Sequence, residues 1–255
     1  MVPSPRTSED DDDNMAETPR PKLTLLGMAV SVMGYFCMVT VADAPRQAKA
    51  QTETSAASSQ GSAKNPASWK SALATVFWVG ETETQDNDHI ANFKSAWDAR
   101  WVEHFGGIDD PHNRCGYEPC GFKPKENPFY VALPYDDMEE NGRRKAVNSF
   151  IPWDAPGAKQ SLLKNRWVAV RANGITCYAQ WQDVGPFEND DAHYVFGAAA
   201  TPKNTKGESA GIDLSPAVRD CLKVGGISRV LWRHVDRREV PAGPWNRTIT
   251  RRPGP

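Results

Sequence analysis

Two β-rich runs joined by an Asn-Gly turn limit the fold of this chain more than any other feature. Residues 166–171 and 175–182 are rich in Val, Ile, Thr, Tyr and Trp, which favour strands, and Asn173-Gly174 lies between the two runs. Asn-Gly is the preferred pair for a two-residue type I′ turn between antiparallel strands. The sequence therefore predicts a β-hairpin whose second strand leads directly into Asp183.

Short strands dominate the rest of the predicted structure. We expect further strands at 72–79, 130–133, 194–196 and 229–235, and helices at 90–105 and 216–223. A doubly wound sheet needs helices that alternate regularly with strands, and these do not alternate. The pattern favours a mainly β fold, a small six-stranded barrel with helical and loop insertions.

The longer predicted helix rests on its aromatic spacing. Phe93, Trp97 and Trp101 recur at intervals of four residues, and Gly106-Gly107 follows as a stop signal. We interpret residues 90–105 as a helix that packs on the barrel.

The N-terminal part of the chain is too polar and too rich in small residues to build a core. Residues 1–22 contain an acidic run and are predicted to be disordered, and residues 45–68 read as a flexible linker. Composition places the folded domain at 69–245, followed by a basic tail at 246–255 that we expect to be loose.

Residues 23–44 form a hydrophobic leader with two interpretations. A signal peptide fits the preceding basic residues, the apolar run and the small-residue pattern Ala48-Lys49-Ala50. An uncleaved membrane anchor fits the length of the uncharged stretch 23–41, which could nearly cross a bilayer as a helix. Both interpretations predict an exported protein, in the periplasm, the cell envelope or the extracellular space, with a possible tether through 23–41.

Composition narrows the class of partner. The net charge is −2, so no basic excess indicates nucleic-acid binding. Nine tryptophans are present, and eight of them lie between Trp78 and Trp245. They could fill a core or serve as platforms on which sugar rings stack, and the sequence leaves both open.

Four cysteines follow the leader, at Cys115, Cys120, Cys177 and Cys221. An even number in an exported domain favours disulfides, and four cysteines allow three pairings. We expect Cys115–Cys120 to close a local loop and Cys177–Cys221 to tie the hairpin to the short helix. His112 beside the first pair does not form a standard zinc pattern, so we expect no metal and no cofactor.

Two aspartates stand where predicted strands break into turns. Asp183 ends the hairpin and precedes Gly-Pro, a strong turn signal. Asp213 lies just before a helix start, with Ser215 as N-cap and Pro216 at the first helical position. Each carboxylate could point into a groove, or it could bond only to backbone amides of its own turn.

The pairing of Asp183-Val-Gly-Pro-Phe with Gly211-Ile-Asp-Leu-Ser-Pro-Ala217 resembles the second half of a double-psi β-barrel. It is most similar to the rare lipoprotein A family of peptidoglycan lytic transglycosylases. Expansins, family 45 endoglucanases and membrane-bound lytic transglycosylase A resemble it more distantly. The resemblance implies that Asp213 matches the catalytic acid of family 45 endoglucanases and of membrane-bound lytic transglycosylase A. It implies that Asp183 matches the catalytic residue of rare lipoprotein A proteins.

The first predicted strand also resembles that of family 45 enzymes and expansins, where a T-x-Y-W pattern lines the groove. Thr75 and Phe77 match it, followed by Trp78. We add Tyr130 and Trp181 as candidate substrate-binding residues.

Two positions depart from these families. The family 45 base would fall on Val79, although Glu81 is close, and Tyr130 stands where rare lipoprotein A proteins carry a histidine. Tyrosine is a poor base near neutral pH.

The sequence thus predicts an exported protein that acts on cell-wall polysaccharide, with peptidoglycan cleavage by lytic transglycosylase chemistry as the first hypothesis. Asp213 is the expected acid/base, and Asp183 supports it. If both carboxylates share one groove, their repulsion should raise one pKa. A β-1,4-glucan hydrolase of family 45 type and a non-catalytic, expansin-like binder or wall-loosening module are the alternatives.

Overall fold

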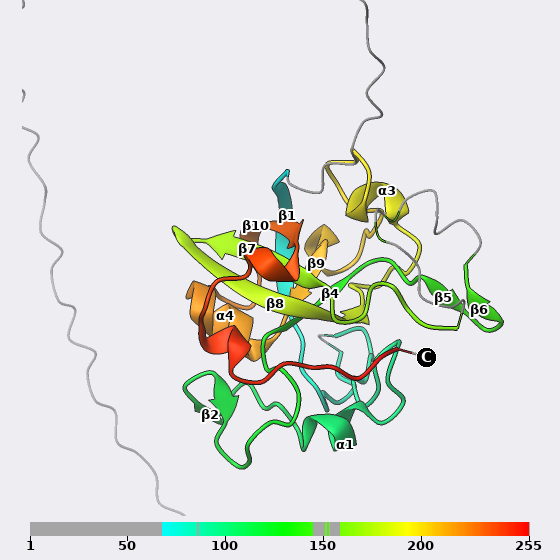
Figure 1. Cartoon of the computed structure of the whole chain (residues 1–255). Helices are drawn as coiled ribbons and strands as arrows, with labels where there is room; N and C mark the ends of the chain where they lie inside the picture. Colours follow the sequence, from blue (N-terminus) through cyan, green and yellow to red (C-terminus); the bar gives the residue numbers. More distant parts are fainter. Residues whose placement is uncertain (1–67, 86, 145–150, 152, 154–158, 255) are drawn as a thin grey trace, which may run out of the picture. The chain divides into compact units, whose positions relative to one another are not determined.

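A closed, six-stranded barrel forms the centre of the computed structural model, which describes residues 68–85, 87–144, 151, 153 and 159–254 (Figure 1). Around the barrel the strands run β1, β10, β7, β8, β4 and β9. Their bounds are β1 (Lys70–Val76), β4 (Tyr130–Leu133), β7 (Trp167–Ala172), β8 (Ile175–Val184), β9 (Ile212–Leu214) and β10 (Ser228–Val235). The mainly β, six-stranded barrel expected from the sequence is confirmed.

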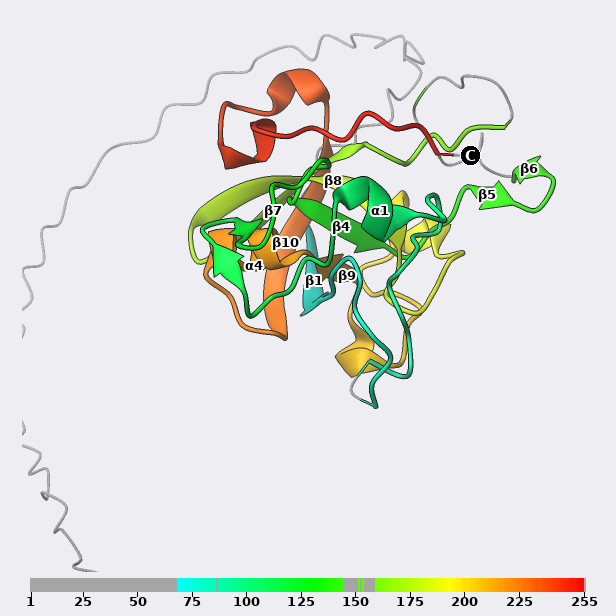
Figure 2. The same cartoon turned by 90° about the horizontal axis from the view of Figure 1, so that it is seen from below.

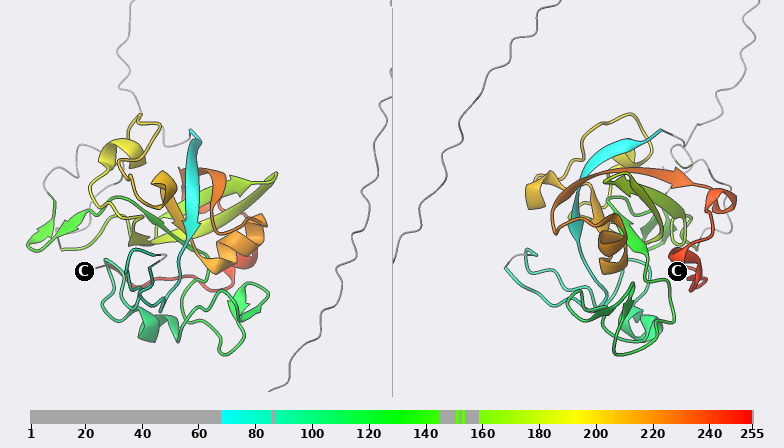
Figure 3. Two further views of the ribbon diagram at one scale, coloured as in Figure 1. Left: turned by 180° about the vertical axis from the view of Figure 1, so that it is seen from behind. Right: turned by 90° about the vertical axis from the view of Figure 1, so that its left-hand side faces the viewer.

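The barrel mixes parallel and antiparallel pairs. β1 is antiparallel to β10, β10 to β7, β7 to β8, and β4 to β9, whereas β1 with β9 and β4 with β8 are parallel. Figure 3 shows β1 and β10 side by side. The hairpin of β7 and β8 turns at Asn173-Gly174, and both residues have the positive φ that a type I′ turn requires.

Alternation along the strands separates two hydrophobic clusters. Val131 and Leu133 of β4 belong to the main core inside the barrel, together with Trp181 of β8. Tyr130 and Ala132, which point the other way, belong to a second cluster on the outer face. The aromatic side chains of this outer cluster come from the segment that joins β1 to β4: Phe77, Trp101 and Phe105.

The segment between β1 and β4 is an insertion on one side of the barrel (Figures 1 and 2). Its regular elements are short: α1 (Trp101–Phe105), β2 (Arg114–Cys115) and β3 (Glu118–Pro119). The other small elements are β5 (Met138–Glu139), β6 (Gly142–Arg143), α3 (Ala192–Val195), η1 (Gly207–Ser209), α4 (Pro216–Leu222), η2 (Arg237–Glu239) and η3 (Pro244–Asn246).

The helix predicted at 90–105 is wrong over most of its length. Only α1 is helical, and Ser95 pairs with Asp98 as an isolated β-bridge before it. The aromatic spacing does not mark one face, because Trp97 packs in the main core while Trp101 packs in the outer cluster. Phe93 packs in neither core and is 49% exposed.

The strand predicted at 194–196 is also wrong, because Tyr194 and Val195 lie in α3 and Phe196 is its C-cap. The side chain of Asp191 accepts a hydrogen bond from the backbone N–H of Tyr194 and caps the helix start. The helix predicted at 216–223 is confirmed as α4, whose N-cap Ser215 accepts from the N–H of Val218.

Both expected disulfides are present. Cys115–Cys120 closes the turn between β2 and β3, and Cys177–Cys221 ties β8 to α4. Disulfides persist in oxidising compartments, so they favour an exported location. Among the described residues no helix is long and apolar enough to cross a membrane; the leader at 23–44 and the linker up to residue 67 lie outside them.

The C-terminal segment is packed rather than loose. The backbone N–H of Thr250 donates to the Gln180 side chain at 2.9 Å, and the Thr250 hydroxyl accepts from the N–H of Asn127 at 2.9 Å. Thr250 is 3% exposed, and Arg252 forms ion pairs with Asp98 and Glu126. The folded unit therefore extends past Trp245 to at least residue 254.

This packing can be tested with two matched substitutions. Thr250→Val keeps the side-chain volume but leaves the buried Asn127 N–H without its acceptor, which should lower the free energy of unfolding by about 1–3 kcal/mol. Thr248→Val is the control, because the Thr248 hydroxyl makes no hydrogen bond to another residue that the structure describes. Urea unfolding compares them, and equal stabilities of the two variants would contradict the packed segment.

Candidate functional site

One row of paired residues crosses four barrel strands and carries both candidate aspartates. Thr75 of β1 pairs with Asp213 of β9, Asp213 with Ala132 of β4, and Ala132 with Asp183 of β8. Directly paired residues point to the same face of a sheet. Since Ala132 belongs to the outer cluster, the two carboxylates and the Thr75 hydroxyl lie on the outer face, beside the insertion.

A register shift brings Asp183 into this row. Tyr130 pairs with Gln180 and Val131 with Trp181, so a regular ladder would place Gln182 opposite Ala132. The ladder is instead shifted by one residue between Val131 and Ala132. Such a bulge redirects a side chain to the other face, and here it directs Asp183 outward.

Asp183 links the barrel to the insertion. One of its carboxylate oxygens, Oδ1, accepts hydrogen bonds from the N–H groups of Ala96 and Val184, both at 2.8 Å. The residue is 7% exposed. The sequence left open whether Asp183 points into a groove or bonds to backbone amides. The carboxylate does bind backbone amides, so part of its role is structural.

Asp213 is half-buried and sits against two neighbours. Its Oδ1 accepts a hydrogen bond from the Thr75 hydroxyl. A Cβ atom at Gly185 would lie 3.1 Å from Asp213 Oδ2, and Gly185 has a φ of +155°, so the Gly of the Gly-Pro turn allows its backbone to approach the carboxylate. Thr75 binds Oδ1, and no hydrogen bond to Oδ2 is present among the described residues.

Burial keeps protons on both carboxyls near neutral pH. It raises the pKa of Asp213 to about 7, against the opposing hydrogen bond from Thr75, and the charges of Asp183 and Glu81 raise it further. Burial also raises the pKa of Asp183 to about 7, against the N–H bonds from Ala96 and Val184. The expected repulsion is present, but it is smaller than the effect of burial, and both pKa values are raised.

Glu81 brings a third carboxylate to this site. It is 6% exposed, burial raises its pKa, and its charge acts on Asp213. The amide of Asn92 donates to Glu81 Oε2 at 2.7 Å, and the backbones of the two residues pair through the Asn92 N–H at 2.9 Å. Glu81, which is close in sequence to Val79, the position of the family 45 base, thus lies in the insertion.

Three candidate substrate-binding residues are buried instead of lining a groove. Trp181 has no exposed surface, since its pairing with Val131 turns it into the barrel. Tyr130 is 1% exposed: its hydroxyl donates to Asp109 at 2.9 Å and accepts from the N–H of Val79 at 3.0 Å. Phe77 packs edge-on against the Tyr130 ring.

Thr75 and Trp78 are the two candidates that keep accessible surface. Thr75 contacts Asp213, and Trp78 lies two residues past the end of β1, between Thr75 and Glu81 in sequence. Within the described ranges no three His, Cys, Asp or Glu side chains are grouped to hold a metal ion.

No protein-family model matches this chain, and no curated protein matches it significantly.

The raised pKa values predict a pH-dependent stability. An unfolded Asp titrates near about 3.9, so the folded protein retains protons between about pH 4 and pH 7 that the unfolded chain has released. The free energy of unfolding should fall as pH rises through this window, by up to about 1.4 kcal/mol per pH unit for each group. Urea unfolding across the window measures the slope.

Asp213→Asn should flatten this slope, because the amide does not titrate. Glu208→Gln removes an exposed carboxyl and should leave the slope unchanged. The same slope in Asp213→Asn and in the parent chain would mean that Asp213 titrates like an ordinary aspartate.

Proposed function

We propose that this chain is an exported protein that cleaves cell-wall polysaccharide, with peptidoglycan as its substrate and lytic transglycosylase chemistry as its reaction. The observation that carries the proposal is the row in which a half-buried Asp213, with a pKa of about 7, lies beside Thr75 and within the field of Asp183 and Glu81. A carboxyl that is protonated near neutral pH is what a general acid requires.

The chemistry needs one principal acid. Protonated Asp213 donates its proton to the glycosidic oxygen as the bond from that oxygen to the anomeric carbon breaks. A hydroxyl of the same sugar then attacks the anomeric carbon, and its proton returns to the Asp213 carboxylate. No water is consumed, and the acid ends in its starting form.

Asp183 supports this cycle through charge and position. In its ionised form Asp183 raises the pKa of Asp213 through its charge, and its bond to the Ala96 N–H fixes the insertion beside the row. We propose a supporting role for Asp183, because Oδ1 is already occupied by two backbone donors.

The resemblance to rare lipoprotein A proteins and to membrane-bound lytic transglycosylase A supports the choice of peptidoglycan, since Asp183, matched to the first family, and Asp213, matched to the second, lie in the same row. Tyr130 departs from the rare lipoprotein A family, and its hydroxyl is engaged within the outer cluster. Burial raises the pKa of Tyr130 well above its ordinary value, so Tyr130 cannot replace the family histidine as a base.

A β-glucan hydrolase is the second candidate, and Glu81 favours it. An inverting hydrolase needs a second carboxylate to activate water. Glu81 lies near enough to act on the pKa of Asp213. The non-catalytic binder has less support, because three of the aromatic residues proposed as sugar platforms are buried.

Digestion assays with the full chain test the proposal. Purified peptidoglycan should yield anhydro-muropeptides, and Asp213→Asn should lower their rate by at least about a hundredfold, the usual contribution of a general acid. Asp190→Asn, an exposed aspartate paired with Lys203, is the matched control and should keep the parental rate.

Glu81→Gln separates the two enzymatic candidates. A transglycosylase should keep releasing anhydro-muropeptides from peptidoglycan in this variant. Reducing ends released from soluble β-glucan alone, and lost in Glu81→Gln, would establish the hydrolase instead. No product from either polysaccharide would contradict both.

A further inference from the structure

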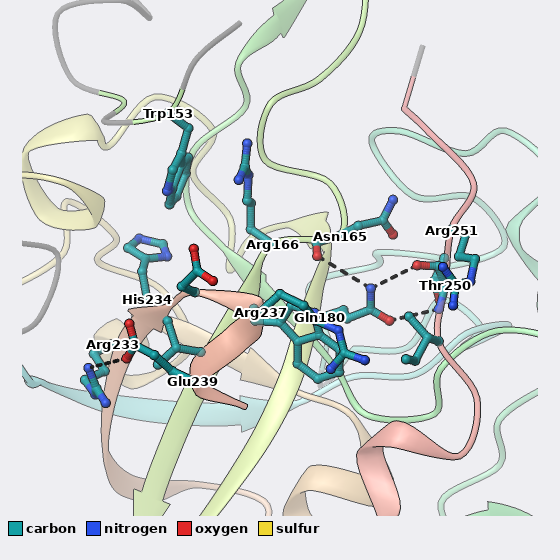
Figure 4. A pocket seen from close by; sticks show the side chains of 14 residues that line it. Trp153, Asn165, Arg166, Gln180, Arg233, His234, Arg237, Glu239, Thr250 and Arg251 are labelled. Atoms are coloured by element: carbon teal, nitrogen blue, oxygen red, sulfur yellow. Dashed lines mark hydrogen bonds and ion pairs between the residues drawn. The ribbon is translucent and has the colours of Figure 1, made fainter. Parts of the chain in front are cut away.

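A cavity of about 490 Å³ lies where the end of β10 and the start of β7 meet the C-terminal segment (Figure 4). Neither Asp213 nor Asp183 lines it. Its walls combine aromatic and cationic side chains: Trp153, Arg166, Trp167, His234, Arg237 and Arg251. Pockets of this volume are large enough for a small organic ligand.

The cavity has an excess of positive charge. Both carboxylates in its lining already have cationic partners: Asp236 pairs with Arg238 at 2.9 Å, and Glu239 with Arg233 at 3.6 Å. The other guanidinium groups of the lining form no ion pair with any residue in the described part of the chain. These are Arg166, Arg237 and Arg251.

Two of these guanidinium groups are held by tryptophan rings. Arg166 lies 4.5 Å from the ring centre of Trp153, and Arg237 lies 5.0 Å from that of Trp167. Stacking uses the face of a guanidinium group and leaves N–H donors along its edge. Arg166 uses its Nε to bond the Leu162 carbonyl, so its terminal nitrogens remain for a ligand.

A buried, uncharged histidine lies in the cavity wall. His234 is 7% exposed and stacks on Phe196 at 5.5 Å. Neither of its ring nitrogens makes a hydrogen bond of normal geometry within the described residues. Both ring nitrogens are buried, and burial lowers the pKa of His234 to about 4, against a nearby backbone contact from Val195, so the ring is neutral and adds no charge to the cavity.

We propose that this cavity binds an acidic sugar, whose carboxylate is held by the guanidinium groups of the lining that form no ion pair with a described residue. The planar N–H donors of a guanidinium group match the geometry of a carboxylate. The choice of a sugar as the carrier of the carboxylate rests on the proposed function, whereas recognition of the carboxylate rests on the cavity alone.

Calorimetric titration of the full chain tests this site. The probe is a trisaccharide of galacturonic acid, compared with neutral galactotriose and with inorganic phosphate, all at neutral pH and low salt. We expect the acidic trisaccharide to bind and the neutral one to bind at least about tenfold more weakly, since each charge-assisted hydrogen bond contributes about that factor.

Substitutions locate the binding. Arg237→Gln combined with Arg251→Gln should weaken the acidic trisaccharide at least about tenfold. Arg229→Gln, an exposed arginine of β10 outside the cavity, should leave its affinity unchanged. Arg237→Lys keeps the charge but loses the planar donors, and should weaken binding as well.

Several outcomes would overturn the proposal. Equal affinity for the neutral and the acidic trisaccharide would show that the cavity does not recognise the carboxylate. Phosphate that binds as tightly as the acidic trisaccharide would show only a general anion site. Unchanged binding in the double variant would place the ligand elsewhere, and no binding at millimolar concentration would refute the site. Asp213→Asn should keep full affinity for the acidic trisaccharide. A failure of the proposed glycan cleavage can therefore be distinguished from a failure of this binding site.

Discussion

The pairing of β4 with both β8 and β9 is the constraint on which the candidate site depends. β4 has only four residues, and its Ala132 lies between Asp183 on one side and Asp213 on the other. The small side chain at Ala132 leaves room for two acidic neighbours on the outer face. The same pairing closes the barrel, so the contact that completes the fold also assembles the acidic row.

Burial by the insertion then gives the row its chemistry. Phe77, Trp101 and Phe105 cover the outer face of β4 next to the carboxylates. Carboxyls beside such an apolar surface lose water, which favours the protonated form. The compensating donors are few: Thr75 for Asp213, and two backbone N–H groups for Asp183. The same insertion supplies Glu81. The insertion therefore affects which carboxyls are protonated and whether a sugar hydroxyl or a water molecule can act as the nucleophile.

The sequence predicted the features that depend on local signals. The Asn173-Gly174 hairpin, the Ser215 cap of α4 and both disulfides are confirmed, because turn chemistry, capping and cysteine pairing can be read within short segments or from simple counts. Five of the predicted strands correspond to barrel strands, whereas β9, which carries Asp213, was not predicted, and the strand expected at 194–196 is absent.

Features that depend on distant contacts could not be predicted. The bulge that directs Asp183 outward is defined only by the register against β4. The direction of Trp181 depends on the same register, which is why this candidate groove residue proved to be buried. The spacing of Trp97 and Trp101 suggested one helix face, although the two rings belong to separate clusters. Packing of Thr250 on Gln180 likewise has no local signature.

A crystal structure of the Asp213→Asn full chain with a peptidoglycan tetrasaccharide would show whether Asp213 is placed to act as the acid. We predict a glycosidic oxygen within hydrogen-bond distance of the side chain at position 213, about 2.6–3.2 Å, with the sugar beside Thr75. A glycan bound away from the row, with no glycosidic oxygen near position 213, would contradict the assignment of Asp213 as the acid.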